Sequence, residues 1–170
     1  MTIRREKLGD KAAVREVNER AFGQPVEADI VDQLRDSCSD LVSLVATRGD
    51  SIVGHILFSP VTVERTGGVV EGMGLAPMAV LPEYQRQGVG SALVEFGLKA
   101  LRERSCPFVI VLGHPEYYPR FGFERASGYD IRCQWSGVPD EAFMIRILDR
   151  SAMAGVSGVA KYRDEFDQGM

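Results

Sequence analysis

Cysteine and histidine are scarce in this 170-residue sequence, and their scarcity excludes several classes of site. The three cysteines, Cys38, Cys106 and Cys133, are odd in number and far apart. They fit neither a disulfide framework nor a CxxC-type metal site. Only His55 and His114 could add imidazole ligands, so we expect no metal in the protein.

An excess of positive charge and a long apolar run are also lacking. The formal net charge is −4 and the sequence pI is about 5.3, so no overall positive field recruits nucleic acid. No run of residues is long and apolar enough to span a bilayer, and residues 1–14 have no apolar core of signal-peptide length. We therefore expect a cytoplasmic protein with neither nucleic-acid nor membrane partners, in which any anionic ligand is held by a local site.

The order of hydrophobic patterns predicts mixed α and β structure. Amphipathic helices are expected over 11–22, after a cap at Asp10, and over 24–37. The β-rich runs on either side of Arg48-Gly49-Asp50 predict an antiparallel hairpin, and further strands are expected over 69–80, 107–113 and 142–148. Between them, residues 87–105 carry a helical repeat made of Val89, Leu93, Phe96, Ala100 and Leu101. The last twenty residues, 151–170, are expected to be an extension that is partly loosely held.

The stretch "QRQGVG" places Gly88 and Gly90 where this central helical pattern begins. The first turn of a helix leaves backbone N–H groups without intrahelical partners, and together with the helix dipole they attract anions, phosphate above all. Glycine lets a ligand approach the backbone, while Ser91 can add a hydroxyl and Arg86 a positive charge. The stretch therefore suggests a pyrophosphate cradle, although for an isolated GxG a tight entry into the helix is the favoured interpretation, since short motifs match by chance.

Two well-known phosphate loops do not fit this stretch. A Walker A loop needs Gly-Lys-Ser/Thr, which the sequence does not contain. A dinucleotide-binding GxGxxG needs glycine at position 93, which is Leu93.

A different family carries this pattern. Residues Gln85 to Gly90 resemble the Q/R-x-x-G-x-G/A signature of the GCN5-related N-acetyltransferase (GNAT) superfamily. Downstream, "YPRFGF", from Tyr118 to Phe123, is similar to the family's Y-x-x-x-G-F element. The apolar strand between the two motifs and the hairpin before them follow the family's order. The resemblance covers residues 3–150, and "LGHPEYYPRFGF" is similar to a subgroup of predicted bacterial acetyltransferases.

The resemblance implies a fold and an activity. The fold would be α/β (α+β), with a central mixed, mostly antiparallel sheet whose central strands splay apart, flanked by helices. The acetyltransferase domain would occupy residues 1–150. It would transfer the acetyl group of acetyl-CoA, a cosubstrate, to a primary amine by direct transfer in a ternary complex. The acceptor would be an amine-bearing small molecule, or a peptide or protein, and pairing of late strands between subunits leaves a homodimer open. A non-catalytic acyl-CoA-binding or regulatory module is the alternative.

The resemblance also implies roles for particular residues. The backbone of Met78, Ala79 and Val80 would pair with the pantetheine arm of the cofactor. The cofactor-binding signature opens at Gln85 and Arg86, and its amides would hold the pyrophosphate, namely those of Gln87, Gly88, Val89, Gly90 and Ser91.

Tyr118 would donate a hydrogen bond, and then a proton, to the departing CoA thiolate. Its neighbour Tyr117 is the competing choice, and a packing tyrosine with its hydroxyl tied to backbone is the structural alternative.

No general base is assigned from the sequence. Some histone-modifying members carry a glutamate ten residues before Gln85, where this chain has Leu75. Other groups in the sequence could remove the proton from the amine, namely Glu71, Glu83, Glu116 and His114. His55, within a predicted strand, is expected to be a satisfied strand residue.

Overall fold

The computed structural model describes all 170 residues, which fall into two units. Unit 1 comprises Met1–Phe58, Ala76–Leu98 and Glu165–Met170, and unit 2 comprises Ser59–Leu75 and Lys99–Asp164. Strands β3 (Ser51–Arg65) and β4 (Gly68–Val80) and helix α3 (Val89–Glu103) each contribute residues to both units.

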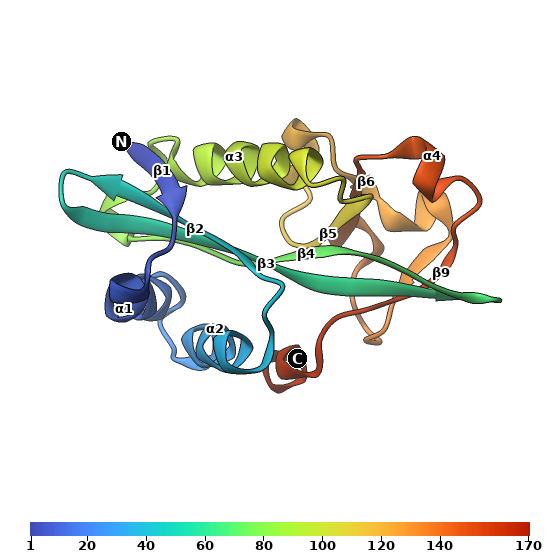
Figure 1. Cartoon of the computed structure of the whole chain (residues 1–170), viewed down its shortest axis with the longest axis horizontal. Helices are drawn as coiled ribbons and strands as arrows, with labels where there is room; N and C mark the ends of the chain where they lie inside the picture. Colours follow the sequence, from blue (N-terminus) through green and yellow to red (C-terminus); the bar gives the residue numbers. More distant parts are fainter. The chain divides into compact units, whose positions relative to one another are not determined.

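Unit 1 is a sheet with helices on both faces. Strand β2 (Val42–Arg48) pairs antiparallel with β1 (Thr2–Arg5) and with β3, and β4 follows β3 in the strand order. The β2–β3 pairing runs from Val42–Phe58 to Arg48–Ser51, which confirms the predicted hairpin. Helices α1 (Lys11–Phe22) and α2 (Val26–Ser37) lie on one face, and the part of α3 in this unit lies on the other (Figure 1).

Strand β3 contacts helices on both faces of the sheet, because the side chains of successive strand residues point to opposite sides. Gly54 faces the start of α3, whereas the next residue, His55, contacts Asn18 of α1. A second close approach lies further along α3, where Gly97 sits against the ring of Phe58. Glycine within a helix costs about 1 kcal/mol relative to alanine, and here the missing side chain makes room for this ring.

The structure qualifies one local prediction in unit 1 and corrects another. Asp10 is the N-cap residue of α1, as predicted, but its carboxylate accepts from the Lys7 amide at 2.7 Å and from Arg4 and makes no capping hydrogen bond to the helix. Phe96 was placed on the inward face of α3, yet it is 45% exposed. Gly97 and Leu98 are buried instead, because the face of α3 that carries Gly97 packs against β3.

Unit 2 holds the second part of the sheet, in the strand order β3-β4-β5-β8-β6. Strand β5 (Phe108–Leu112) pairs parallel with β4 over Met73–Leu75 and antiparallel with β8 (Phe143–Ile147), which also pairs with β6 (Glu124–Arg125). From Phe108 to Val111, β5 is at most 1% exposed, as expected of a strand covered on both faces. The short elements of the whole chain, in both units, are α4 (Arg150–Met153) and six 3-10 helices, Leu8–Asp10, Pro82–Tyr84, Tyr118–Phe121, Ala126–Tyr129, Asp140–Ala142 and Asp164–Gly169.

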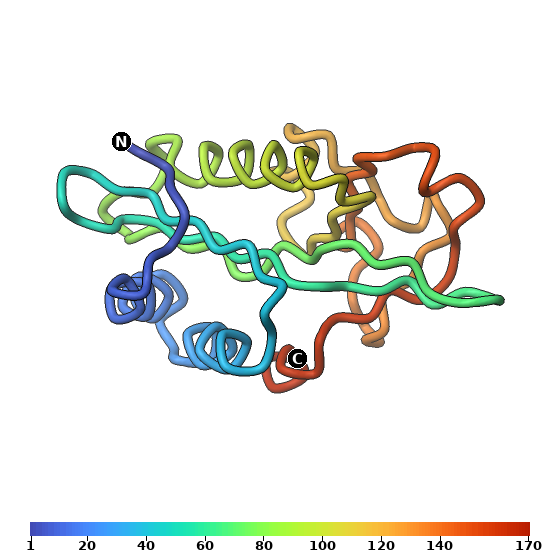
Figure 2. The backbone as a smooth tube through the Cα atoms, viewed as in Figure 1, coloured from blue at the N-terminus to red at the C-terminus, as the bar shows by residue number.

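The residues after 150 contribute to both units. In unit 2, β9 (Gly158–Lys161) pairs antiparallel with β3 and parallel with β7 (Ile131–Cys133). In unit 1, the last residues lie beside α2 (Figure 2), where the Gln168 Nε2 donates to the Gln33 Oε1 at 2.9 Å. A functional boundary at residue 150 stays a prediction. None of the helices in the structure has the length and apolar character needed to cross a membrane.

Candidate functional site

The predicted cradle is an exposed loop in unit 1, between the end of β4 and the start of α3. Residues Gln85 to Gly88 are exposed, and Arg86 and Gly88 have left-handed backbone angles, with φ of 61° and 85°. A side chain at Gly88 would meet no atom within 4 Å, so the space above it is open. The Ala92 amide donates to the Gly88 carbonyl at 3.0 Å, so Gly88 accepts the first hydrogen bond of the helix, which begins at Val89.

Hydrogen bonds within the loop hold its shape. The Gln85 Nε2 donates to the Val80 carbonyl at 3.0 Å, and the Gln87 Nε2 donates to the Glu83 carbonyl at 3.1 Å. The side chains of both glutamines, which belong to the predicted cofactor-binding signature, thus bind the loop's own backbone. The Gln85 backbone amide also donates within the loop, to the Pro82 carbonyl at 3.3 Å, so of these two residues Gln87 is the one whose amide is predicted to bind the pyrophosphate.

Contacts from three other elements of unit 1 support the loop. The Arg20 guanidinium of α1 forms an ion pair with Glu83 at 2.6 Å, and Arg48 at the end of β2 lies 5.3 Å above the ring of Tyr84. The Leu81 amide donates to a β3 carbonyl at 2.9 Å. These supports come from residues far away in the sequence, and sequence patterns did not indicate them.

The charge at the loop is suited to an anion. The first-turn amides of a helix carry partial positive charge, and Arg86 adds a full positive charge on an exposed side chain. Just before the loop, Ala79 and Val80 of β4 are buried and Met78 is half-buried. The loop and the strand end therefore combine exposed donors with an apolar strand, which fits a ligand that has a pyrophosphate and a less polar arm.

Tyr118 lies in unit 2, where it is the first residue of the 3-10 helix Tyr118–Phe121 that follows β5, and it is 7% exposed. Its ring packs edge-on against Tyr117 at 5.1 Å and Phe123 at 5.6 Å, and its Cε2 lies 2.4 Å from where a side chain on Gly113 would begin. Burial raises the pKa of the Tyr118 phenol, so it stays protonated at neutral pH. Edge-on packing of these rings accounts for the burial of Tyr118.

The residues considered as bases differ in their surroundings. Leu75 is 2% exposed and pairs with Val111, so this position carries no proton acceptor. Glu83 is held by Arg20, whereas His114 is exposed directly after Gly113. Glu71 and Glu116 are also exposed.

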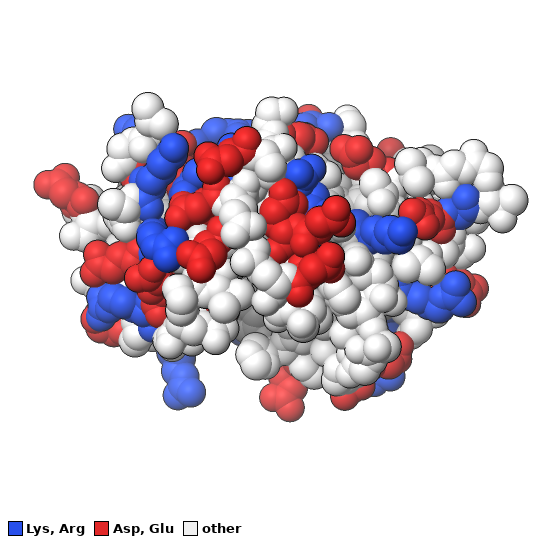
Figure 3. Space-filling view, turned by 90° about the horizontal axis from the view of Figure 1, so that it is seen from below, with Lys and Arg blue, Asp and Glu red and all other residues white.

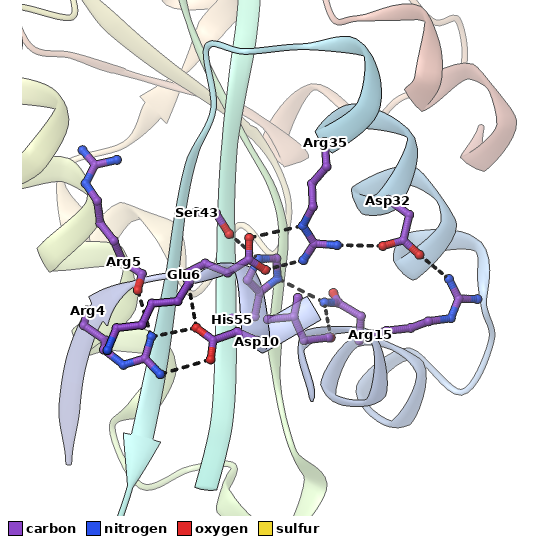
Figure 4. Close-up of polar contacts among 12 residues, drawn as sticks. Arg4, Arg5, Glu6, Asp10, Arg15, Asp32, Arg35, Ser43 and His55 are labelled. Carbon is purple, nitrogen blue, oxygen red and sulfur yellow. Dashed lines mark hydrogen bonds and ion pairs between the residues drawn. The ribbon is translucent and has the colours of Figure 1, made fainter. Parts of the chain in front are cut away.

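A buried polar cluster in unit 1 was not predicted as such (Figure 4). His55 is completely buried, with its Nδ1 3.0 Å from the Asn18 Nδ2 and its Nε2 2.9 Å from the Ser43 Oγ. The expectation of a satisfied strand residue is confirmed. Above it, Arg35 bonds with Glu6 and with Asp32, which also binds Arg15.

The face that carries α1 and α2 shows acidic and basic side chains close together (Figure 3). Arg15 pairs with Asp29 and Asp32, each at 2.8 Å, and with Glu19 at 2.7 Å. These pairs join α1 to α2, so the charges on this face are partly neutralised by one another. Across the chain, the structure contains no group of three or more His, Cys, Asp or Glu side chains arranged to hold a metal ion.

Comparison with known proteins assigns the class. The chain belongs to the acetyltransferase (GNAT) domain family, whose model matches residues 2–126. It is 37% identical to the N-acetyltransferase YhbS of Escherichia coli over 169 residues, or 99% of each chain. The crystal structure of YhbS in complex with CoA superposes with a TM-score of 0.91 at 36% identity, over 98% of this chain and 91% of that one.

A second solved structure agrees with the first. A GNAT family acetyltransferase from Brucella melitensis, in complex with acetyl-CoA, has a TM-score of 0.78 at 32% identity and covers 98% of this chain and 97% of that one. The predicted family and its mixed sheet flanked by helices are thereby confirmed. The roles of individual residues stay predictions.

Proposed function

We propose that the protein is an acetyl-CoA-dependent N-acetyltransferase that acts on a primary amine by direct transfer in a ternary complex. One observation carries the proposal: the exposed loop at the start of α3, with open space over Gly88, occurs in a chain that matches CoA-bound YhbS over 98% of its length. When bound, acetyl-CoA supplies the acetyl group as an activated thioester.

The proposed binding residues follow from the loop and the strand before it. The backbone of Met78, Ala79 and Val80 would pair with the pantetheine arm as an added strand. The amides from Gln87 to Ser91 would bind the pyrophosphate, and Arg86 would add positive charge. The side chains of Gln85 and Gln87 would act by shaping the loop, since both bind its carbonyl groups.

Tyr118 would stabilise the thiolate that leaves when the acetyl group is transferred. An ordinary thiol has a pKa of about 8.5, below the ordinary tyrosine value of about 10. Burial raises the pKa of Tyr118 further, so the phenol is the weaker acid. Because the pKa of the phenol is higher than that of the thiol, the Tyr118 hydroxyl is expected to donate a hydrogen bond to the sulfur and to keep its proton. The proton on the free thiol would come from the amine that is acetylated, through solvent.

Two measurements test the donor site. We expect isothermal titration to show binding of acetyl-CoA and CoA, and Gly90→Asp to abolish it, because a carboxylate in the first turn repels phosphate. Gly90 has no left-handed backbone angle, so aspartate fits its backbone. Gly128→Asp adds the same charge at an open position in a short helix of unit 2 and should bind CoA normally. Wild-type protein that binds neither compound would reject the proposal.

A non-catalytic acyl-CoA-binding module is the second candidate, favoured by the apolar, buried Leu75 where some family members carry a glutamate. The two candidates differ in turnover. Release of CoA thiol, followed with a panel of amines, amino acids and peptides, should be saturable in the acceptor if the protein is an enzyme. Tight CoA binding without release with any acceptor would favour the module.

A further inference from the structure

We propose that two adjacent residues of β3, Val53 and Gly54, form the seat that positions both ends of the cofactor loop. The proposal rests on the proposed function, because it assigns positioning residues to the proposed CoA site. Both residues lie in unit 1, as does the whole loop.

The first end of the loop is held by a hydrogen bond. The Leu81 amide donates to the Val53 carbonyl at 2.9 Å, immediately after β4 ends at Val80. Val53 is fully buried and Leu81 is 9% exposed, so water competes little for this bond. The position at which the chain leaves the sheet is thus set by β3.

The second end is held by close packing. A Cβ atom on Gly54 would lie 2.9 Å from the Val89 Cγ1 and 3.1 Å from the Leu93 Cδ1. Val89 is the first residue of α3, between Gly88 and Gly90, and it is 1% exposed. The first turn therefore rests on the backbone of β3, which requires that residue 54 have no side chain.

Contacts on the other face of β3 prevent the strand from moving away from α3. His55 is fixed there between Asn18 and Ser43, by contacts of 3.0 and 2.9 Å. A methyl group at position 54 would therefore have to be accommodated on the side of α3. Because Phe58 also holds the helix at Gly97, we expect the strain to lift the first turn, where the amides of the loop begin.

The first test is Gly54→Ala. We expect the dissociation constant for CoA, measured by isothermal titration, to rise about tenfold or more, since loss of one hydrogen bond to a charged group has an effect of this order. Gly72→Ala is the matched control, because it places a methyl group 2.7 Å from the ring of Phe108 at a strand position of unit 2. Equal loss of CoA affinity in both variants at equal loss of thermal stability would overturn the proposal.

A second substitution that restores CoA binding would distinguish a specific contact between Gly54 and α3 from a general loss of stability. Val89→Ala removes the contacting methyl groups, so Gly54→Ala/Val89→Ala should bind CoA within about threefold of Val89→Ala alone, because the new methyl group occupies the space that the valine methyl groups left. This comparison holds even if Gly54→Ala alone fails to fold. An affinity that stays low in the double variant, or a folded Gly54→Ala protein that binds CoA as wild type does, would contradict the seat.

A readout without ligand distinguishes this proposal from the proposed function. In the free protein, Gly54→Ala should speed hydrogen exchange of the Ala92 amide, which donates to Gly88. Gly72→Ala should leave that exchange unchanged, and the double variant should restore it. If wild-type protein fails to bind CoA, the proposed function fails, while this exchange pattern still decides the seat.

Discussion

The Nδ1 of His55 lies 3.0 Å from the amide nitrogen of Asn18, and both side chains are completely buried. The Asn18 Nδ2 also donates to the Val14 carbonyl at 3.0 Å, so it is the donor toward His55. His55 Nδ1 then accepts, and the hydrogen on Nε2 is donated to the Ser43 Oγ. A neutral imidazole thereby joins α1 to β2 and β3.

This geometry predicts a pH-dependent stability. Burial lowers the pKa of His55 to about 3, and the nearby Arg35 charge lowers it as well. An unfolded histidine binds a proton near pH 6.5, whereas folded His55 does not above about pH 3. As the pH falls from 6.5 toward 3, only the unfolded state takes up this proton, and the free energy of unfolding should decrease by up to about 1.4 kcal/mol per pH unit.

Urea unfolding between pH 7 and pH 5 measures this effect. His55→Gln should remove the contribution of His55 to the change of unfolding free energy with pH. It should also lower the stability at pH 7, because Asn18 and Ser43 lose their hydrogen-bond partner. His114→Gln, at an exposed position, is the control that should retain His55's contribution. Parallel curves for wild type and His55→Gln would show that His55 is not held neutral.

The ion pair between Arg20 and Glu83 predicts a small but specific effect on the loop. Both side chains are exposed, so solvent screens the pair and its contribution should be small. We expect Arg20→Glu to weaken CoA binding by about two- to fivefold, and Arg20→Glu/Glu83→Arg to recover most of the loss. Titrations at low and high salt check this, since the coupling should shrink with screening. If the loss of CoA binding free energy in the double variant equalled the sum of the losses in the two single variants, the ion pair would not support the loop.

Tyr118→Phe tests the proposed hydrogen bond to the leaving thiolate. We expect kcat to fall about 10- to 150-fold, as for loss of a hydrogen bond to a charged group, with CoA affinity nearly unchanged. Steady-state assays of CoA release, paired with titration, give both quantities. Tyr117→Phe is the comparison, and a larger fall in that variant would transfer the role to Tyr117.

Gly113 should control the position of the Tyr118 ring. A Cβ atom there would lie 2.4 Å from the ring's Cε2, so Gly113→Ala should displace the phenol and lower kcat. In a Tyr118→Phe background the same change should cost little further activity, because the hydroxyl is already absent. Gly128→Ala, at an open position, should be neutral. If the two substitutions lowered ln kcat by fully additive amounts, Gly113 would not act through the Tyr118 hydroxyl.

Patterns confined to one stretch of chain were predicted well. The hairpin around Gly49, the buried strand from Phe108 and the start of α3 just after Gly88 were predicted from turn residues, apolar runs and glycine spacing. These signals are local, because backbone conformation and the unpaired amides of a helix start depend on neighbouring residues. The amino-acid sequence by itself therefore determined the order of elements and, through its paired motifs, the family.

Only the tertiary structure decided which side chains meet. Helical periodicity placed Phe96 inward, but the close approach of Gly97 to Phe58 turns α3 and leaves Phe96 exposed. Spacing alone did not reveal that Gln85 and Gln87 bind loop carbonyls, nor that Gly54 admits the first turn of α3. The physical reason is that such contacts join segments distant in sequence, and their geometry exists only after the sheet and helices have packed.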